Sequence, residues 1–160
     1  METTIEIVER KLSDIRSKRV AAALAYWTLK KGERQFPTRA DFIPREMKEF
    51  LQNVHLYDVL DDTTFRAALL GTMMINAVGK EMTGAIIGAD GVHPVARRMF
   101  IVLSRTLAAR KPLLVVAAEA VAKYTDGRGM ETLAAPLSDE GDKITHLFCA
   151  TAFIAHPLPA

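Results

Sequence analysis

Paired cysteines, long apolar runs and an excess of one charge sign are all missing from this 160-residue chain. Its single cysteine, Cys149, cannot form an internal disulfide, which is typical of proteins in a reducing compartment. No uninterrupted apolar stretch reaches the roughly 18–20 residues that cross a bilayer, and the first residues lack the pattern of a secretory signal. We therefore expect a cytoplasmic protein that does not insert into a membrane.

The charge balance argues against nucleic acid as a partner. The chain has 21 Lys and Arg residues against 19 Asp and Glu residues, so its formal net charge is only +2. With 49% hydrophobic and 25% charged residues, the composition is that of a globular chain rather than a disordered one. The length fits a single hydrophobic core.

Residue clusters that carry common chemistries are also scarce. His55, His93, His146 and His156 lie far apart and have no neighbouring cysteines, so the sequence indicates no metal site. No Gly-Lys-Ser or Gly-Lys-Thr triplet occurs, which excludes a phosphate-binding loop. Cys149 stands in an apolar segment, where a buried and unreactive thiol is expected.

Hydrophobic periodicity predicts an α+β fold. Strand patterns separated by turn residues favour an antiparallel sheet of five strands with helices on one face. A long amphipathic helix is expected before the sheet, where apolar residues recur three and four positions apart. The expected helices are Thr4–Lys30, Met73–Gly84 and Pro94–Ala109, and the expected strands are Val54–Leu60, Phe65–Thr72, Leu113–Lys123, Glu131–Leu137 and Lys143–Phe153.

The expected N-terminal helix carries a heptad pattern. Its a and d positions permit a seam between two copies of the chain, although packing on its own domain explains the pattern equally well. The chain then divides into residues 1–36, a helix and connector, and residues 37–156, the domain proper. The dimer-interface candidates are Ile5, Val8, Leu12, Ile15, Ala22 and Tyr26.

Four sequence stretches in register resemble the bacterial single-domain proteins of the PAS type, in the divergent group with a tryptophan-containing N-terminal helix. The first is the connector Pro37-Thr38-Arg39-Ala40-Asp41-Phe42-Ile43-Pro44, which follows Trp27. The others are Leu56-Tyr57-Asp58-Val59 with Phe65-Arg66 and Gly71-Thr72, then Gly79 with Met82-Thr83-Gly84, and finally Leu133 with Pro136-Leu137-Ser138 and Gly141.

The resemblance implies a fold used for sensing small ligands and for docking to other proteins, usually as a dimer. It implies no particular reaction. Related sensors sometimes hold a flavin beside a reactive cysteine or a haem on a helical histidine. Here no cysteine precedes Cys149, and His93 is explained more simply as the residue that opens a helix before Pro94. We therefore expect no cofactor.

A non-catalytic sensory or docking module is the leading functional hypothesis, with a homodimer, a signalling protein or a small apolar ligand as partners. Methionine lines adaptable pockets, although it also fills ordinary cores. The alternative is a small isomerase or hydratase whose polar pocket uses Asp58 and His146. The ligand-pocket candidates are Tyr57, Leu69, Met73, Met74, Met82, Met99, Phe100 and Phe148.

Overall fold

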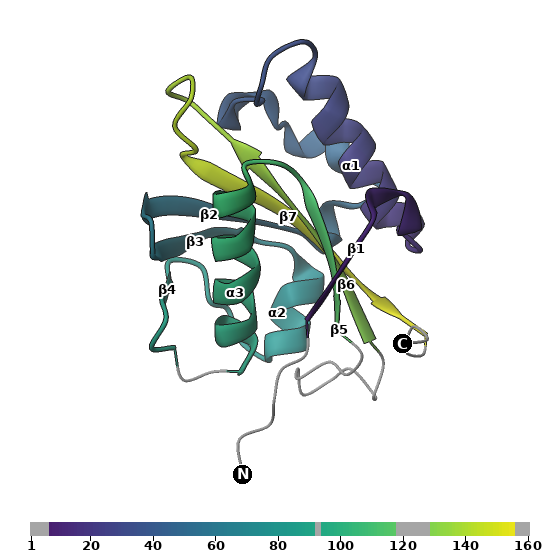
Figure 1. Cartoon of the computed structure of the whole chain (residues 1–160). Coiled ribbons are helices and arrows are strands. Elements are labelled where there is room, and N and C mark those ends of the chain that lie inside the picture. Colours follow the sequence, from purple (N-terminus) through teal and green to yellow (C-terminus); the bar gives the residue numbers. More distant parts are fainter. Residues whose placement is uncertain (1–6, 92–93, 118–128, 156–160) are drawn as a thin grey trace.

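The computed structural model describes residues 7–91, 94–117 and 129–155, which form one antiparallel sheet with helices on both faces (Figure 1). The strands are β1 (Val8–Arg10), β2 (Val54–Asp61), β3 (Thr64–Leu70), β4 (Ile86–Ile87), β5 (Leu113–Ala117), β6 (Gly129–Leu137) and β7 (His146–Ile154). The α-helices are α1 (Lys18–Lys31), α2 (Thr72–Val78) and α3 (Pro94–Ala109). Short 3-10 helices cover Leu12–Asp14, Arg39–Asp41, Pro44–Met47 and Leu51–Asn53.

The strand order in the sheet is β1-β5-β6-β7-β2-β3-β4, and each neighbouring pair is antiparallel. The β2–β3 hairpin lies beside the last strand, where Leu56 pairs with Phe148. This confirms the predicted antiparallel α+β fold. The five predicted strands correspond to β2, β3, β5, β6 and β7, and the short strands β1 and β4 extend the sheet at its edges. The end of the predicted strand Leu113–Lys123 lies outside the described residues.

Two hydrophobic clusters cover the two faces of the sheet, because side chains alternate along each strand. In β7, Leu147 and Cys149 belong to the cluster that α2 and α3 cover, whereas Phe148 and Ala150 belong to the cluster that α1 covers. The prediction of helices on one face of the sheet therefore holds for α2 and α3 only, since α1 packs on the other face. Burial from both sides explains why β6 and β7 are almost continuously apolar.

The N-terminal helix begins later than predicted. Residues Val8–Arg10 pair with β5 as an edge strand, Leu12–Asp14 form a 3-10 turn, and α1 starts only at Lys18. Its N-cap is Ser17, whose hydroxyl accepts a hydrogen bond from the Val20 amide at 3.3 Å. The apolar spacing before residue 17 therefore belongs to a strand and a turn, and the continuous heptad seam does not form. The division of the chain at residue 37 stays a prediction.

A buried carboxylate from the sheet fixes the start of α1. Glu131 in β6 is fully buried, and its oxygens accept hydrogen bonds from the backbone amides of Arg16 (2.9 Å) and Ser17 (3.0 Å). The N-terminal end of a helix favours negative charge because its first amides are unpaired and its dipole is positive there. One helical turn before its C-terminal end, the Trp27 indole donates to the Pro136 carbonyl at 3.0 Å. Both ends of α1 are thus held to β6.

Helix α2 begins where two backbone segments touch. The Gly71 amide donates to the Val54 carbonyl at 2.7 Å, and a Cβ atom at Gly71 would overlap the carbonyl oxygen of Gln52. Because only glycine leaves room for this approach, Gly71 sets α2 close to the Leu51–Asn53 turn. Thr72, predicted as the last residue of a strand, is instead the first residue of this helix.

Candidate functional site

A cavity of about 50 Å³ lies between the sheet and helices α2 and α3. Tyr57 from β2 and Ala67 from β3 line its sheet side, and Met74 from α2 and Met99 from α3 line its helix side. Ile86, which is 59% exposed, also lines it, so the cavity meets the surface at the β4 edge. Among the described lining residues, Tyr57 carries the only hydroxyl, and the rest are apolar. Such a lining suits a compact apolar molecule.

Four of the eight ligand-pocket candidates line this cavity, namely Tyr57, Met74, Met82 and Met99. Their contact with a ligand stays a prediction. Met73 and Phe100 pack against the same hydrophobic cluster without lining the cavity.

Leu69 and Phe148 require a correction, because they lie on the opposite face of the sheet. Both belong to the hydrophobic cluster that α1 covers, and both pair with Leu56, whose side chain points to the same side. The ring of Phe148 packs edge to face against Phe42 at a centroid distance of 4.6 Å. The cause of the misplacement is that β7 is apolar on both faces, so alternation alone does not show which face carries the cavity.

A second and smaller cavity, of about 10 Å³, adjoins the first. The two share Met74, Val95 and Met99 as a common wall. Thr132 from β6 and the buried Arg98 from α3 also line the smaller cavity. Flexible methionines thus separate two small spaces, and their movement would join them.

A buried chain of polar side chains runs between these cavities on the sheet surface. The Tyr57 hydroxyl lies 2.8 Å from His55 Nδ1, and His55 Nε2 lies 2.7 Å from the Thr151 hydroxyl. The Thr151 and Thr132 hydroxyls are 2.8 Å apart. All four side chains are buried. These four residues were not predicted as a group, because β2 lies far from β6 and β7 in the sequence.

Burial decides the protonation states along this chain. It lowers the pKa of His55 to about 3, so the imidazole is neutral at ordinary pH. It raises the pKa of the Tyr57 phenol well above 10, so the hydroxyl keeps its proton. Burial also raises the pKa of the Cys149 thiol far above its usual range, as expected for an unreactive cysteine.

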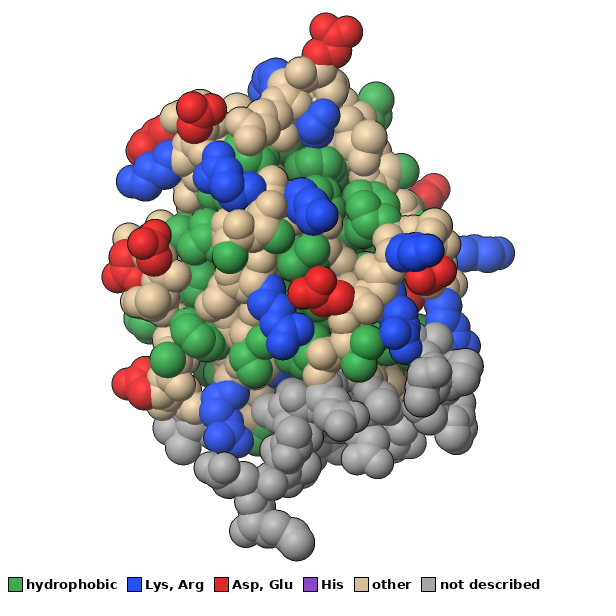
Figure 2. All heavy atoms as spheres, viewed as in Figure 1, with side chains coloured by type: hydrophobic (Ala, Val, Ile, Leu, Met, Phe, Trp, Pro, Cys, Tyr) green, Lys and Arg blue, Asp and Glu red, His purple; other side chains and the backbone are tan. Residues whose placement is uncertain are grey.

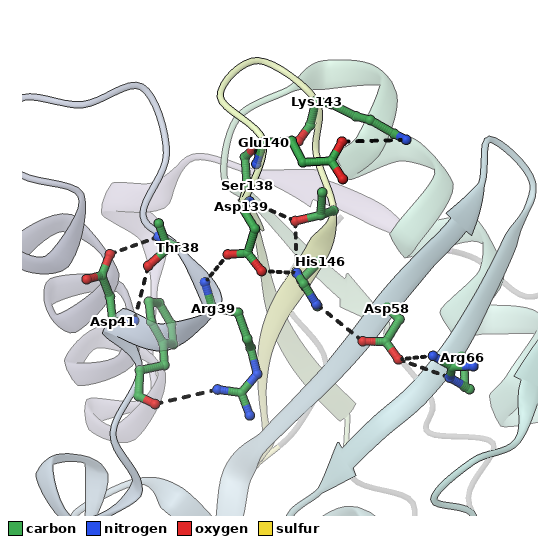
Figure 3. A network of polar contacts seen from close by, with 12 residues as sticks. Thr38, Arg39, Asp41, Asp58, Arg66, Ser138, Asp139, Glu140, Lys143 and His146 are labelled. Carbon is green, nitrogen blue, oxygen red and sulfur yellow. Dashed lines mark hydrogen bonds and ion pairs between the residues drawn. The ribbon is translucent and has the colours of Figure 1, made fainter.

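A separate polar network links strand ends and the connector at one end of the sheet (Figure 3). The Arg39 amide donates to Asp139 at 2.9 Å, Asp139 lies 3.8 Å from His146 Nδ1, and His146 Nε2 lies 3.4 Å from Asp58. Asp58 also accepts two hydrogen bonds from the Arg66 guanidinium at 2.9 and 3.0 Å. The structure thus brings together Asp58 and His146, the pair of the alternative enzyme hypothesis, but neither residue lines the cavities under α2 and α3.

The connector owes its shape to a capping box. The Thr38 amide donates to the Asp41 carboxylate at 2.8 Å, and the Asp41 amide donates to the Thr38 hydroxyl at 3.3 Å. Burial alone would raise the pKa of Asp41, but hydrogen bonds from Thr38 and Arg34 outweigh it and hold that pKa below its usual value. The Thr-Arg-Ala-Asp stretch is therefore a structural turn that positions Arg39 beside the β6–β7 turn.

The dimer-interface candidates do not share one helical face. Val8 and Leu12 are exposed, Ile15 and Ala22 are half-buried, and Ile5 lies outside the described residues. Tyr26 is instead buried in its own domain, where its hydroxyl donates to Glu46 at 2.8 Å. An open groove follows the outer side of α1 and is lined by Leu12, Ser13, Ile15, Ala21, Leu24, Ala25, Thr28 and Leu29.

The surface agrees with the balanced composition. On the face in Figure 2, basic and acidic side chains are interspersed with hydrophobic ones rather than gathered by sign. In the part of the chain that the structure describes, no helix is long and apolar enough to cross a membrane. Within the same residues, no group of three or more His, Cys, Asp or Glu side chains is placed to hold a metal ion.

Comparison with known proteins identifies the family. No curated protein matches the sequence. The crystal structure of an IcIR transcriptional regulator from Alicyclobacillus acidocaldarius is 8% identical, with a TM-score of 0.34, and the match covers 86% of this chain and 58% of that chain. The sequence model of the family described as "PAS domain" matches residues 15–151, most of the chain. This chain therefore belongs to the PAS domain family.

Proposed function

We propose that this PAS domain is a non-catalytic sensor that binds a compact apolar ligand in the cavity between the sheet and helices α2 and α3. The cavity itself is the observation that supports this most strongly, because its described walls are apolar and include three methionines. Methionine side chains have several rotatable bonds and a polarisable sulfur, so they can adjust to a ligand. Ligand occupancy would then change a surface that a partner protein recognises.

The enzyme hypothesis has weaker support. Both carboxylate oxygens of Asp58 already have partners, His146 on one side and Arg66 on the other. A general base needs a free oxygen within reach of a substrate proton. The Asp58–His146 pair therefore serves better as a link between β2 and β7 than as a catalytic pair.

Substituting Ala67→Val should abolish ligand retention without unfolding the protein. Ala67 lines the cavity from β3 and is buried, so the two added methyl groups enter the cavity space. Valine also suits a strand. Native mass spectrometry of the protein purified from its own host should show a bound small molecule on the unmodified chain and none on the variant.

The matched control is Ala135→Val, which adds the same groups to a buried strand position on the α1 side. Equal retention by the unmodified chain and by Ala67→Val would place the ligand elsewhere and contradict the proposed site. If this control folds, it should retain the molecule.

We further propose that the groove on the outer side of α1 receives the same helix of a second copy. Ala21, Ala25 and Thr28 form a floor of small side chains, while Leu24 and Leu29 stand beside it. Leu29 is 74% exposed and can enter the partner's groove, as a two-fold contact requires. One helix thus supplies both the protruding and the recessed parts of a self-complementary surface.

The double substitution Leu12→Asp with Leu29→Asp should convert this dimer to a monomer, halving the mass in light scattering. Four charges near the two-fold axis would be desolvated or repel one another. Leu60→Asp is the control, because Leu60 is also exposed but lies on the β2–β3 hairpin. An unmodified chain that is already monomeric, or a double variant that stays dimeric, would remove α1 from the interface.

A further inference from the structure

The polar chain under the cavities has ends that face different spaces. Tyr57 lines the larger cavity, and Thr132 lines the smaller one. His55 lies between them, bonded through Nδ1 to Tyr57 and through Nε2 to Thr151. Because this imidazole is neutral, one ring nitrogen carries a proton and donates while the other accepts.

The two tautomers of the neutral His55 ring define two sets of arrangements that satisfy all three hydrogen bonds. In the first, Tyr57 donates to Nδ1 and Nε2–H donates to Thr151, while the Thr151–Thr132 bond can run in either direction because a hydroxyl oxygen has two lone pairs. In the second, Nδ1–H donates to Tyr57 and Thr151 donates to Nε2, so Thr132 must donate to Thr151. The Tyr57 proton then has no partner within the chain, and an acceptor for it must come from the larger cavity, which Tyr57 lines.

The first arrangement is favoured while the larger cavity holds no hydrogen-bond acceptor. A phenol proton turned into an apolar space would be an unsatisfied buried donor. No other side chain of the described walls carries an oxygen or nitrogen that could accept this proton.

We propose that this chain makes the cavity selective for a compact apolar ligand with one hydrogen-bond acceptor, such as a carbonyl oxygen, which accepts from Tyr57 and reverses both hydrogen bonds of the His55 ring. This inference rests on the proposed ligand-binding function. The apolar walls match an alkyl or aryl body in chemistry, and the acceptor completes the second arrangement. Because a six-membered ring is larger than a cavity of about 50 Å³, the flexible methionine side chains must move to admit it. A ligand of the same shape without the acceptor leaves the first arrangement in place.

The reversal keeps charge and protons in balance. Each hydroxyl keeps its own proton and rotates about its C–O bond. The imidazole loses one proton from Nε2 and gains one at Nδ1 by exchange with water during brief opening of the site, so it is neutral in both states. Thr132 and Thr151 are paired neighbours on β6 and β7. The second arrangement requires Thr132 to donate to Thr151, so ligand binding also fixes the direction of a hydrogen bond at the centre of the sheet.

The test uses cyclohexanone and methylenecyclohexane, two probes of nearly equal shape of which only the first carries an acceptor oxygen. Nitrogen-15 NMR of the His55 ring reports the tautomer, and the Met74 and Met99 methyl signals report cavity binding. We expect the Nε2–H tautomer in the free protein and with methylenecyclohexane, and the Nδ1–H tautomer with cyclohexanone. Cyclohexanone should also bind about 2- to 10-fold more tightly, as one net hydrogen bond allows.

Two variants separate this role from simple packing. Tyr57→Phe should remove both the preference for cyclohexanone and the tautomer change. Thr132→Val, at the far end, should leave the preference for cyclohexanone in place, because the Thr132–Thr151 hydrogen bond is present in both arrangements and Tyr57 is unchanged.

Equal affinity for the two probes with an unchanged His55 tautomer would overturn the selective chain and leave the cavity as a binding site. If neither probe moves the two methionine signals, the proposed ligand site fails, and this inference fails with it. A free protein already in the Nδ1–H state would overturn the inference without any probe.

Discussion

Replacing Phe148 with alanine should lower the free energy of unfolding by about 3–5 kcal/mol, the usual cost of removing a fully buried phenylalanine. Phe148 has no exposed surface, and its ring packs against Phe42 beneath α1. Because it lies on the face opposite the cavity, the folded variant should bind cyclohexanone as the unmodified protein does. Urea unfolding followed by Trp27 fluorescence measures the first effect, and methionine NMR measures the second.

Leu60→Ala is the control for this experiment, because Leu60 is exposed and its truncation should change stability by less than about 0.5 kcal/mol. A loss below about 1 kcal/mol for Phe148→Ala would contradict its burial under α1. Loss of probe binding in a variant that remains folded would return Phe148 to the ligand site.

The substitution Glu131→Leu should destabilise the protein by about 1–3 kcal/mol, since it removes two hydrogen bonds that each contribute about 0.5–1.5 kcal/mol. The Arg16 and Ser17 amides both lose their acceptor, and the start of α1 is released from β6. Hydrogen exchange in the first turn of α1 should become faster, whereas exchange in α3 should follow global stability alone.

Glu131→Gln is the matched variant, because its amide oxygen can still accept one of the two hydrogen bonds. Its loss of stability should fall between that of the unmodified chain and that of Glu131→Leu. If both substitutions are neutral, the carboxylate does not hold α1, and the helix depends on Trp27 and the apolar contacts of its inner face.

The elements predicted best are those whose ends carry local signals. Helix α3 begins at Pro94 and ends at Ala109, the predicted bounds, because a proline opens it and Arg110 adopts a left-handed conformation before Pro112. Asp and Thr residues in the turn between β2 and β3 likewise marked where the first hairpin strand ends and the second begins. In both places the local residue types were sufficient to predict the boundary.

The errors arose where a distant partner decides the structure. The three- and four-residue spacing of Val8, Leu12 and Ile15 fits a helix, but the free edge of β5 recruits the segment as a strand instead. The hydrogen bond between His55 and Thr151 joins residues 96 positions apart, so no local sequence pattern predicts the buried polar chain. Three methionines that line the cavity, Met74, Met82 and Met99, were still among the candidates, because methionines near a strand and a helix are a local sign of an adaptable apolar wall.

The proposed sensory function requires the space between the sheet and helices α2 and α3 to be the ligand site of this PAS domain. Carbon-13 methyl NMR of the methionines during titration with cyclohexanone tests it most directly, because Met47 lies in the cluster on the opposite face and serves as an internal control. We expect saturable shifts at Met74, Met82 and Met99, with Met47 unchanged. Shifts at Met47 alone, equal shifts at all four, or no saturable shift at any of them would contradict it.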